Sequence, residues 1–225
     1  TVGDGNPVVR NHTQALLSVD DCCMMAFADT SEAARSSFSK ANPSIAEAQI
    51  FAEIADLPNE HWDWIILCTP TQRRLADVVS VLTKCPRLLL LEKPLAANSS
   101  DGRAIIEACR DAGVQLRVNF NRRFDGAITR FRRNFSGTPR LFIGRYNNGL
   151  FNYASHMVDL LCHWYGAVSE VQATGSTGGE ADPVVSFVCR MQAGFEAHII
   201  GVPGVDYDQF EMEFHFSNSR AELIN

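Results

Sequence analysis

The sequence predicts an α/β fold in which a doubly wound parallel sheet precedes an α+β region with a mainly antiparallel open sheet. Short apolar runs alternate with helix-like stretches up to about residue 120, as in a parallel sheet flanked by helices. Beyond that point, several alternating strands follow one another without long helices between them. Polar residues end the apolar runs of the first region, where such sheets bind ligands. We therefore expect two domains, 1–121 and 122–225.

The first domain is predicted from apolar runs and from the amphipathic stretches between them. The runs predict strands at 22–29, 62–70, 87–94 and 114–120. Cap residues and helical spacing predict helices at 30–41, 72–85 and 99–113. In the helix at 72–85, the spacing predicts a buried face formed by Leu75, Val78, Val79 and Leu82.

The second domain is predicted to contain two helices and an open sheet. The helices are expected at 122–135 and at 154–166, where Gly166 closes the second one. Strands are expected at 140–147, 168–176, 183–192, 194–202, 208–217 and 220–225. The segment 175–183 is interpreted as a flexible hairpin loop. The apolar residues Val185, Phe187, Phe214 and Phe216 predict an open sheet face that meets a second copy in a homo-oligomer.

Composition restricts the classes of partner. With 46% hydrophobic and 20% charged residues, the chain can bury a substantial core. A net charge of −6 does not favour nucleic acid, and the five arginines between 122 and 133 are expected to form a solvated helix face. No apolar run has the length of a membrane span, so we expect no membrane partner. Seven cysteines without a C-x-x-C pair favour a reducing, cytoplasmic location.

A glycine turn stands at the start of the chain. Gly3 and Gly5 allow a tight turn, and Asn6 is a suitable cap for the helix that follows. The N–H groups at such a helix start can bind a pyrophosphate, as in Rossmann-type dinucleotide-binding folds. Val8 replaces the third glycine of the G-x-G-x-x-G pattern, so a tight turn without a ligand remains an alternative.

Asp29 ends the first predicted strand after the glycine turn. An acidic residue at this place binds the ribose hydroxyls of a dinucleotide. The alternative is a local role at the start of the next helix, which Thr30 or Ser31 could also fill. No arginine follows at once to neutralise a 2′-phosphate, so the sequence favours NAD over NADP. Domain 1–121 is therefore predicted to bind a dinucleotide.

Four motifs occur along the chain, namely CTPTQ at 68–72, EKP at 92–94, NFNRRF at 119–124 and GLFNYASHMVDLLCHWYG at 149–166. Together they resemble motifs of the Gfo/Idh/MocA family of NAD(P)-dependent sugar and cyclitol oxidoreductases. The resemblance implies cofactor contacts for Thr69, Pro70, Glu92 and Lys93. It implies substrate contacts for Asn121, Arg122, Asn152 and His156. It also implies that the chain is truncated at both ends, as a shortened piece, a set of ordered segments or a naturally reduced homologue.

The resemblance further implies that Lys93 and His156 are catalytic. A positively charged nicotinamide beside Lys93 would depress the pKa of its ammonium and help it to exchange a proton. The Lys93–Pro94 peptide bond is expected to be cis. Many members carry an aspartate where this chain has Asn152, and an amide cannot take a proton, so acid–base chemistry is assigned to Lys93 and His156. The alternatives are a surface lysine and a histidine whose ring is satisfied within the helix.

These patterns predict an NAD(P)-dependent oxidoreductase that acts on a secondary alcohol of a sugar, a cyclitol or a nucleotide sugar. Asn152 gives some weight to the nucleotide sugars, because the resemblance extends to nucleotide-sugar 3-dehydrogenases with asparagine there. The alternatives are a non-catalytic dinucleotide-binding sensor and a structural subunit that has lost its cofactor. No metal is expected, although His156, Asp159 and His163 lie near one helical face, because their neighbours are those of a core helix.

Overall fold

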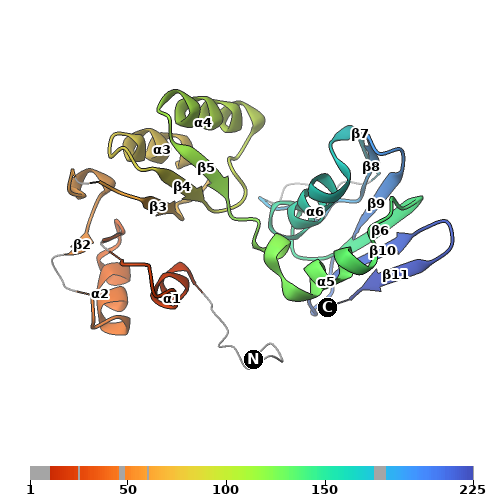
Figure 1. The fold of residues 1–225 in the computed structure, drawn as a ribbon, viewed down its shortest axis with the longest axis horizontal. Coiled ribbons are helices and arrows are strands. Elements are labelled where there is room, and N and C mark those ends of the chain that lie inside the picture. The colour runs from red at the N-terminus through yellow and green to blue at the C-terminus, as the bar shows by residue number, and fades with distance from the viewer. Residues whose placement is uncertain (1–10, 25, 46–48, 60, 175–180, 225) are drawn as a thin grey trace.

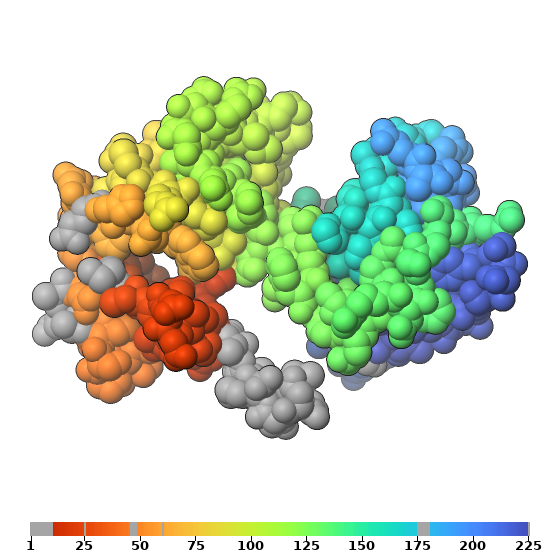
Figure 2. Space-filling view, in the orientation of Figure 1, coloured from red at the N-terminus to blue at the C-terminus, as the bar shows by residue number. Residues whose placement is uncertain are grey.

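The computed structural model describes residues 11–24, 26–45, 49–59, 61–174 and 181–224. Figure 1 shows two parts side by side, of which the first contains two parallel sheets and the second contains one larger sheet. In Figure 2 the two parts form separate lobes, which the green segment that follows strand β5 (Gln115–Val118) joins through a narrow waist. Among the described residues, no helix is both long and apolar enough to cross a membrane.

The first part contains a three-stranded parallel sheet. Its strands β3 (Trp64–Leu67), β4 (Leu88–Leu91) and β5 lie in the order of the chain. Helices α3 (Arg74–Leu82) and α4 (Ser99–Asp111) cover one side of the sheet in Figure 1. The buried side chains form one apolar cluster, in which the leucines of β4 have helix side chains around them. The predicted alternation of strands and helices is thereby confirmed in this region.

The elements nearest the N-terminus include a second, two-stranded sheet. They are α1 (His12–Leu17), β1 (Phe27–Ala28), α2 (Glu32–Ala41), β2 (Ile50–Phe51) and η2 (Ile54–Asp56). Strand β1 pairs in parallel with β2, so the described strands of this region form two parallel sheets instead of the single sheet that we expected. Strand β2 was not predicted, because two residues are too few to show a periodic pattern.

The buried face of α3 differs from the prediction. Val78 and Val81 are completely buried, whereas Val79 is 53% exposed. Arg74 lies on the buried face and is only 2% exposed. Helical spacing alone cannot select between two overlapping faces when an arginine stem packs inward like an apolar side chain.

The second part begins with the 3-10 turn η3 (Asn121–Phe124) and helix α5 (Gly126–Asn134). We expected one helix over 122–135, but it is interrupted at Asp125. The Asp125 carboxylate accepts the N–H groups of Ala127 at 2.8 Å and Ile128 at 3.0 Å, which is how an N-cap residue starts a new helix. A π-helical turn, η4 (Leu150–Ala154), leads into helix α6 (Ser155–Tyr165), which Gly166 ends with a φ of +88°.

Six strands form the sheet of the second part, in the order β11-β10-β6-β9-β8-β7. Neighbours pair antiparallel except β6 and β9, so the prediction of a mainly antiparallel sheet is confirmed. The strands are β6 (Leu141–Tyr146), β7 (Val168–Ala173), β8 (Phe187–Met191), β9 (Glu196–Gly201), β10 (Phe210–His215) and β11 (Arg220–Leu223).

The residues that we predicted for the open face of this sheet do not lie on it. Phe187 and Phe214 are 8% and 0% exposed and belong to the apolar core beneath α5 and α6, and Phe216 packs against that core. Val185 has its backbone bound to the Tyr146 hydroxyl. Because side chains alternate along a strand, the open face is formed by the intervening residues. This open face carries Leu141, Ile143, Arg145, Val188, Arg190, Glu196, His198, Ile200, Glu211, Glu213, His215, Arg220 and Glu222.

Candidate active site

The candidate site lies where the two parts of the chain meet. Thr69 and Pro70 follow β3, Glu92 and Lys93 follow β4, and the turn η4 and helix α6 approach from the second part. We call this region the crevice and define it by Thr69, Glu92, Lys93, Asn152 and His156. Parallel strands present their carboxyl ends at one edge of a sheet, so the sequence correctly predicted that the residues after β3 and β4 are neighbours.

Glu92 forms a network at the end of β4. Its Oε1 accepts a hydrogen bond from Nε2 of His12 at 2.7 Å and another from Nδ2 of Asn119 at 2.8 Å. Its Oε2 accepts the N–H of Lys93 at 3.3 Å. Burial would raise the pKa of Glu92, but the bonds from Asn119 and His12 lower it below its ordinary value. Glu92 is therefore a carboxylate at neutral pH, and the roles of His12 and Asn119 were missed from the sequence.

Arg74 connects the ends of β3 and β4. Its Nε donates to the carbonyl oxygen of Thr69 at 3.1 Å, and its guanidinium also donates to the carbonyl oxygens of Glu92 and Pro94. Burial lowers the pKa of Arg74 from its ordinary value. The guanidinium thus holds the backbone on both sides of Lys93. The arginine pair in QRRL gave no signal that one member would be buried.

Lys93 reaches from the first part to the second. Its Nζ donates to Oδ1 of Asn152 at 2.6 Å and to the carbonyl oxygen of Asn152 at 3.0 Å. The Lys93–Pro94 bond is cis, as expected. Burial lowers the pKa of the Lys93 ammonium, and Arg122 acts in the same direction, while Glu92 and Asp182 oppose both effects. The predicted site residues Lys93 and Asn152 are therefore in direct contact.

His156 lies in the first turn of α6 and is 7% exposed. Its ring meets Phe120 edge-on, with the ring centroids 5.8 Å apart. Within the described part of the chain, the buried Nδ1 has no hydrogen-bond partner. Burial, followed by the charges of Lys93 and Arg122, lowers the pKa of His156 to about 4. The imidazole is therefore neutral at neutral pH, and its Nδ1 has no partner among the described residues.

Arg122 and Asn121 lie beside the crevice. With Phe124, Asp125 and His156 they line an open pocket of about 440 Å³. The Arg122 guanidinium carbon is 3.8 Å from the ring centroid of Phe210, a cation–π geometry, so this arginine is directed inward.

Arg123 also departs from the solvated arginine face that we expected. It forms a bidentate ion pair with Asp159 on α6, with 2.7 Å between Nε and Oδ2. The guanidinium packs inward against α6 because this carboxylate compensates its charge.

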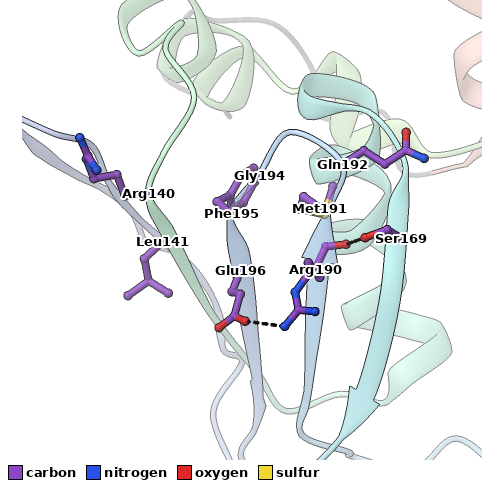
Figure 3. Close-up of a pocket in the computed structure, with 9 residues that line it drawn as sticks. All are labelled: Arg140, Leu141, Ser169, Arg190, Met191, Gln192, Gly194, Phe195 and Glu196. Carbon is purple, nitrogen blue, oxygen red and sulfur yellow. Dashed lines mark hydrogen bonds and ion pairs between the residues drawn. The ribbon is translucent and has the colours of Figure 1, made fainter.

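A second pocket lies away from this region. It has a volume of about 540 Å³ and surrounds the turn between β8 and β9 (Figure 3). Two of its charged side chains, Arg190 and Glu196, form an ion pair with 3.3 Å between Nη2 and Oε1. None of its lining residues belongs to the crevice or to the predicted site. Its larger volume therefore does not identify it as the active site.

The predicted dinucleotide contacts are partly within the described residues. Asp29 follows β1, and its Oδ1 accepts the N–H of Ser31 at 2.8 Å, while Ser31 is the cap of α2. Thr69 has a buried Oγ1 without a hydrogen-bond partner in the part of the chain that is described. A buried hydroxyl of this kind suits a ligand group at the strand ends, so the residues fit a dinucleotide. The predicted Gly3, Gly5 and Asn6 lie outside the described residues.

The chain is similar to two curated dehydrogenases. It is 28% identical over 115 residues to an inositol 2-dehydrogenase of Rhizobium meliloti, an alignment that covers 51% of this chain and 33% of that protein. It is 24% identical over 134 residues to an inositol 2-dehydrogenase of Salmonella typhimurium, covering 52% of this chain and 40% of that protein. The chain thus spans well under half the length of the curated relatives that it matches.

Solved structures share its fold. A probable dehydrogenase from Thermotoga maritima superimposes with a TM-score of 0.79 at 23% identity, over 95% of this chain and 72% of the other. The WlbA dehydrogenase from Bordetella pertussis, solved with NADH and UDP-GlcNAcA, gives a TM-score of 0.75 at 19% identity, over 88% of this chain and 68% of the other.

A family model covers more than half of the chain. It matches residues 2–120 and describes an oxidoreductase family with an NAD-binding Rossmann fold. The match includes Glu92, Lys93 and the strand ends of the crevice. The chain therefore belongs to the Gfo/Idh/MocA oxidoreductase family.

Proposed function

We propose that the protein is an NAD(P)-dependent oxidoreductase that moves a hydride between nicotinamide and a secondary alcohol of a sugar, a cyclitol or a nucleotide sugar. The observation that carries this proposal is the bond from Lys93 to Asn152, beside a neutral buried His156, at the strand ends of the sheet. The curated relatives named inositol 2-dehydrogenase support the substrate class. The structure solved with NADH and UDP-GlcNAcA supports both the cofactor and a nucleotide sugar.

The proposed cofactor is NAD rather than NADP. Asp29 would hold the ribose hydroxyls, and Thr69, Pro70, Glu92 and Lys93 would contact the remainder. Gly3, Gly5 and Asn6 would complete the site at the pyrophosphate. When bound, NAD supplies the group that accepts the hydride. Asp29 also opposes a 2′-phosphate by charge, which is the reason for the preference.

The side chains divide the proton chemistry between them. Lys93 would exchange a proton with the substrate hydroxyl, since its lowered pKa favours release of that proton. Asn152 accepts from the ammonium and keeps it directed into the crevice. The neutral His156 would bind the same hydroxyl through a ring nitrogen. Asn121 and Arg122 would bind other polar groups of the substrate along the pocket that they line.

A two-stage measurement tests this function. Nicotinamide fluorescence on titration with NADH and NADPH shows whether the protein binds a dinucleotide. Reduced-cofactor formation with a panel of sugars, cyclitols and nucleotide sugars shows whether it turns one over. We expect binding in the first stage and one active class in the second. Binding without turnover would instead favour the dinucleotide sensor, and no binding at all would favour a structural subunit.

Two further features are proposed for the chain as a whole. The boundary between a dinucleotide-binding domain and a substrate domain is placed at residue 121, and the two separate apolar clusters support it. The open face of the six-stranded sheet is proposed to contact a second copy. Ile143 and Ile200 on this face are surrounded by paired charges such as Arg145 and Glu213, a composition that suits an interface with a polar rim.

A further inference from the structure

Asp182 lies in the segment before β8 and contacts the turn that carries Asn152. Its Oδ1 accepts the N–H of Phe151 at 2.7 Å, and its Oδ2 accepts the N–H of Asn152 at 3.1 Å. The neighbouring Pro183 accepts the N–H of Leu150 through its carbonyl oxygen at 2.8 Å. Three consecutive N–H groups at the start of η4 are therefore bound by two consecutive residues from a distant part of the chain. These N–H groups would otherwise lack a partner within the helix.

Gly149 makes this close approach possible. Its φ of +86° is a backbone conformation that favours glycine. A Cβ atom at this position would collide with the Asp182 carboxylate. The carboxylate thus occupies the space that any other side chain at 149 would fill, directly against the backbone that leads into Asn152.

The segment that carries Asp182 is itself anchored to the sheet. The Tyr146 hydroxyl donates to the carbonyl oxygen of Val185 at 2.6 Å and accepts the N–H of Val185 at 2.9 Å. Tyr146 is completely buried. Gly201 also allows the backbone of residues 184 and 185 to approach β9 closely, since a Cβ there would contact Val184. Asp182 therefore lies three residues before Val185, whose backbone is bonded to Tyr146 of the six-stranded sheet.

From these contacts we propose that Asp182 is the positioning residue that orients the turn of Asn152 and, through Asn152, the Lys93 ammonium. This inference rests on the proposed function for its effect on turnover. The carboxylate binds the Asn152 N–H, and both the carbonyl oxygen and Oδ1 of Asn152 accept from Lys93. Asp182 also contributes a negative charge on the side of the crevice opposite the first part of the chain, where Asn152 itself is uncharged.

The effect of the Asp182 charge on the pKa of Lys93 has a predictable direction. Lys93 is surrounded by Glu92 and Asp182, which stabilise the ammonium, and by Arg122, which destabilises it. His156 is neutral at neutral pH. Removing the Asp182 charge should therefore move the titration of Lys93 to lower pH. Removing the bonds to Phe151 and Asn152 should loosen the turn and lower turnover.

Two variants separate these effects. Asp182→Asn removes the charge and retains one acceptor oxygen, whereas Asp182→Ala removes both. Asp56→Asn is the matched control, because Asp56 accepts the backbone N–H of Glu53 at 3.1 Å in η2, away from the crevice. The titration of Lys93 is followed by NMR with 13C at the lysine ε carbons. The chain has three lysines, and Lys93→Met identifies the signal.

We expect the Lys93 midpoint to move to lower pH in both Asp182 variants and to stay in place in Asp56→Asn. We expect the kcat of Asp182→Ala to fall by about 10- to 100-fold, with NADH affinity retained and a smaller loss in Asp182→Asn. An unchanged Lys93 midpoint in folded Asp182→Asn would overturn the proposal, as would an equal shift in the control. Because the titration needs no turnover, it decides on Asp182 even if the substrate screen fails and the proposed function falls.

Discussion

The Lys93 ammonium donates to both oxygens of Asn152, at 2.6 Å to Oδ1 and at 3.0 Å to the carbonyl oxygen. This contact joins the tip of β4 to the turn before α6, which are 59 residues apart in the sequence. An amide oxygen accepts from an ammonium but does not take its proton. Lys93 is therefore held in place and remains able to exchange a proton with a third group.

Replacing Lys93 with methionine should abolish most of the turnover. The change keeps the length of the side chain and removes the ammonium, so loss of acid–base help should cost about 10²- to 10⁴-fold in kcat. NADH affinity, measured by fluorescence titration, should change little. Lys40→Met is the control, since Lys40 is exposed on α2. Near-normal turnover in Lys93→Met would refute its assigned role. If Lys93 and His156 act together, the loss of kcat in the double variant with His156→Ala should be smaller than the product of the two single losses.

The buried His156 should make the free energy of unfolding depend on pH. Its folded-state pKa of about 4 lies below its ordinary value of 6.5, so protonation favours the unfolded chain. The contribution of the neutral His156 to the free energy of unfolding is fully present above pH 6.5. It is lost as the pH falls towards 4, by up to about 3 kcal/mol. Urea unfolding at several pH values should show this loss in the unmodified protein and not in His156→Gln. In His61→Gln, where the side chain is 70% exposed, the loss should persist.

The charge of Asp29 should set the choice between the two dinucleotides. The unmodified protein should bind NADH more tightly than NADPH. Asp29→Asn keeps an oxygen for the N–H of Ser31, so the start of α2 should not be disturbed. Because it removes the charge, it should narrow the difference between the affinities for NADH and NADPH. Glu32→Gln, an exposed change in the first turn of α2, should leave both affinities as they are. Equal affinities in the unmodified protein would contradict the preference.

Arg74 should be far more important for stability than its neighbour Arg73. Arg74→Met leaves the carbonyl oxygens of Thr69 and Glu92 without their donor, which should lower the free energy of unfolding by about 2–4 kcal/mol. Arg73 is 60% exposed and makes one contact of 3.4 Å with the Asp77 carboxylate, which is 7% exposed, so Arg73→Met should cost less, about 1 kcal/mol. Equal losses in denaturant unfolding would show that the bonds of Arg74 contribute no more than the single ion pair of Arg73.

The open sheet face should mediate assembly in solution. Sedimentation velocity at micromolar concentration should show an oligomer for the unmodified protein. Ile200→Asp places a charge on the open face at a position that is 38% exposed, and it should shift the protein towards the monomer. Val171→Asp changes a more exposed residue of the edge strand β7 and should leave the oligomer intact. A monomeric unmodified protein would rule out this interface and leave the fold as it is.

Much of the fold could be predicted because its signals are local. Four leucines predicted β4, and the helix that ends at Gly166 was predicted from its spacing and its glycine. Strand and helix periods are properties of a few consecutive residues, so they survive without knowledge of the rest of the chain. The polar residues at strand ends are also a local signal. Their positions after two predicted parallel strands indicated that Thr69, Glu92 and Lys93 are neighbours.

The choice between two faces of one element could not be made in this way. Phe214 was expected on an open face and lies in the core, and Val79 was expected in the core and is 53% exposed. A strand pattern shows which residues share a face, but the packed helices decide which face they cover. Arg74 illustrates the limit, because only the arrangement of carbonyl groups around it makes its burial favourable.

The sequence by itself determined most of the elements, their order and the chemical types of residue at the strand ends. Only the tertiary structure decided which distant residues complete the site. His12 meets Glu92 across 80 residues, and Asp182, expected in a flexible loop, binds the turn of Asn152 across 30. Such pairs leave no periodic signal in the chain, since their contact depends on how two separately formed sheets and their helices pack. The physical reason is that local propensity acts over a few residues, whereas the geometry of a crevice is set by long-range packing.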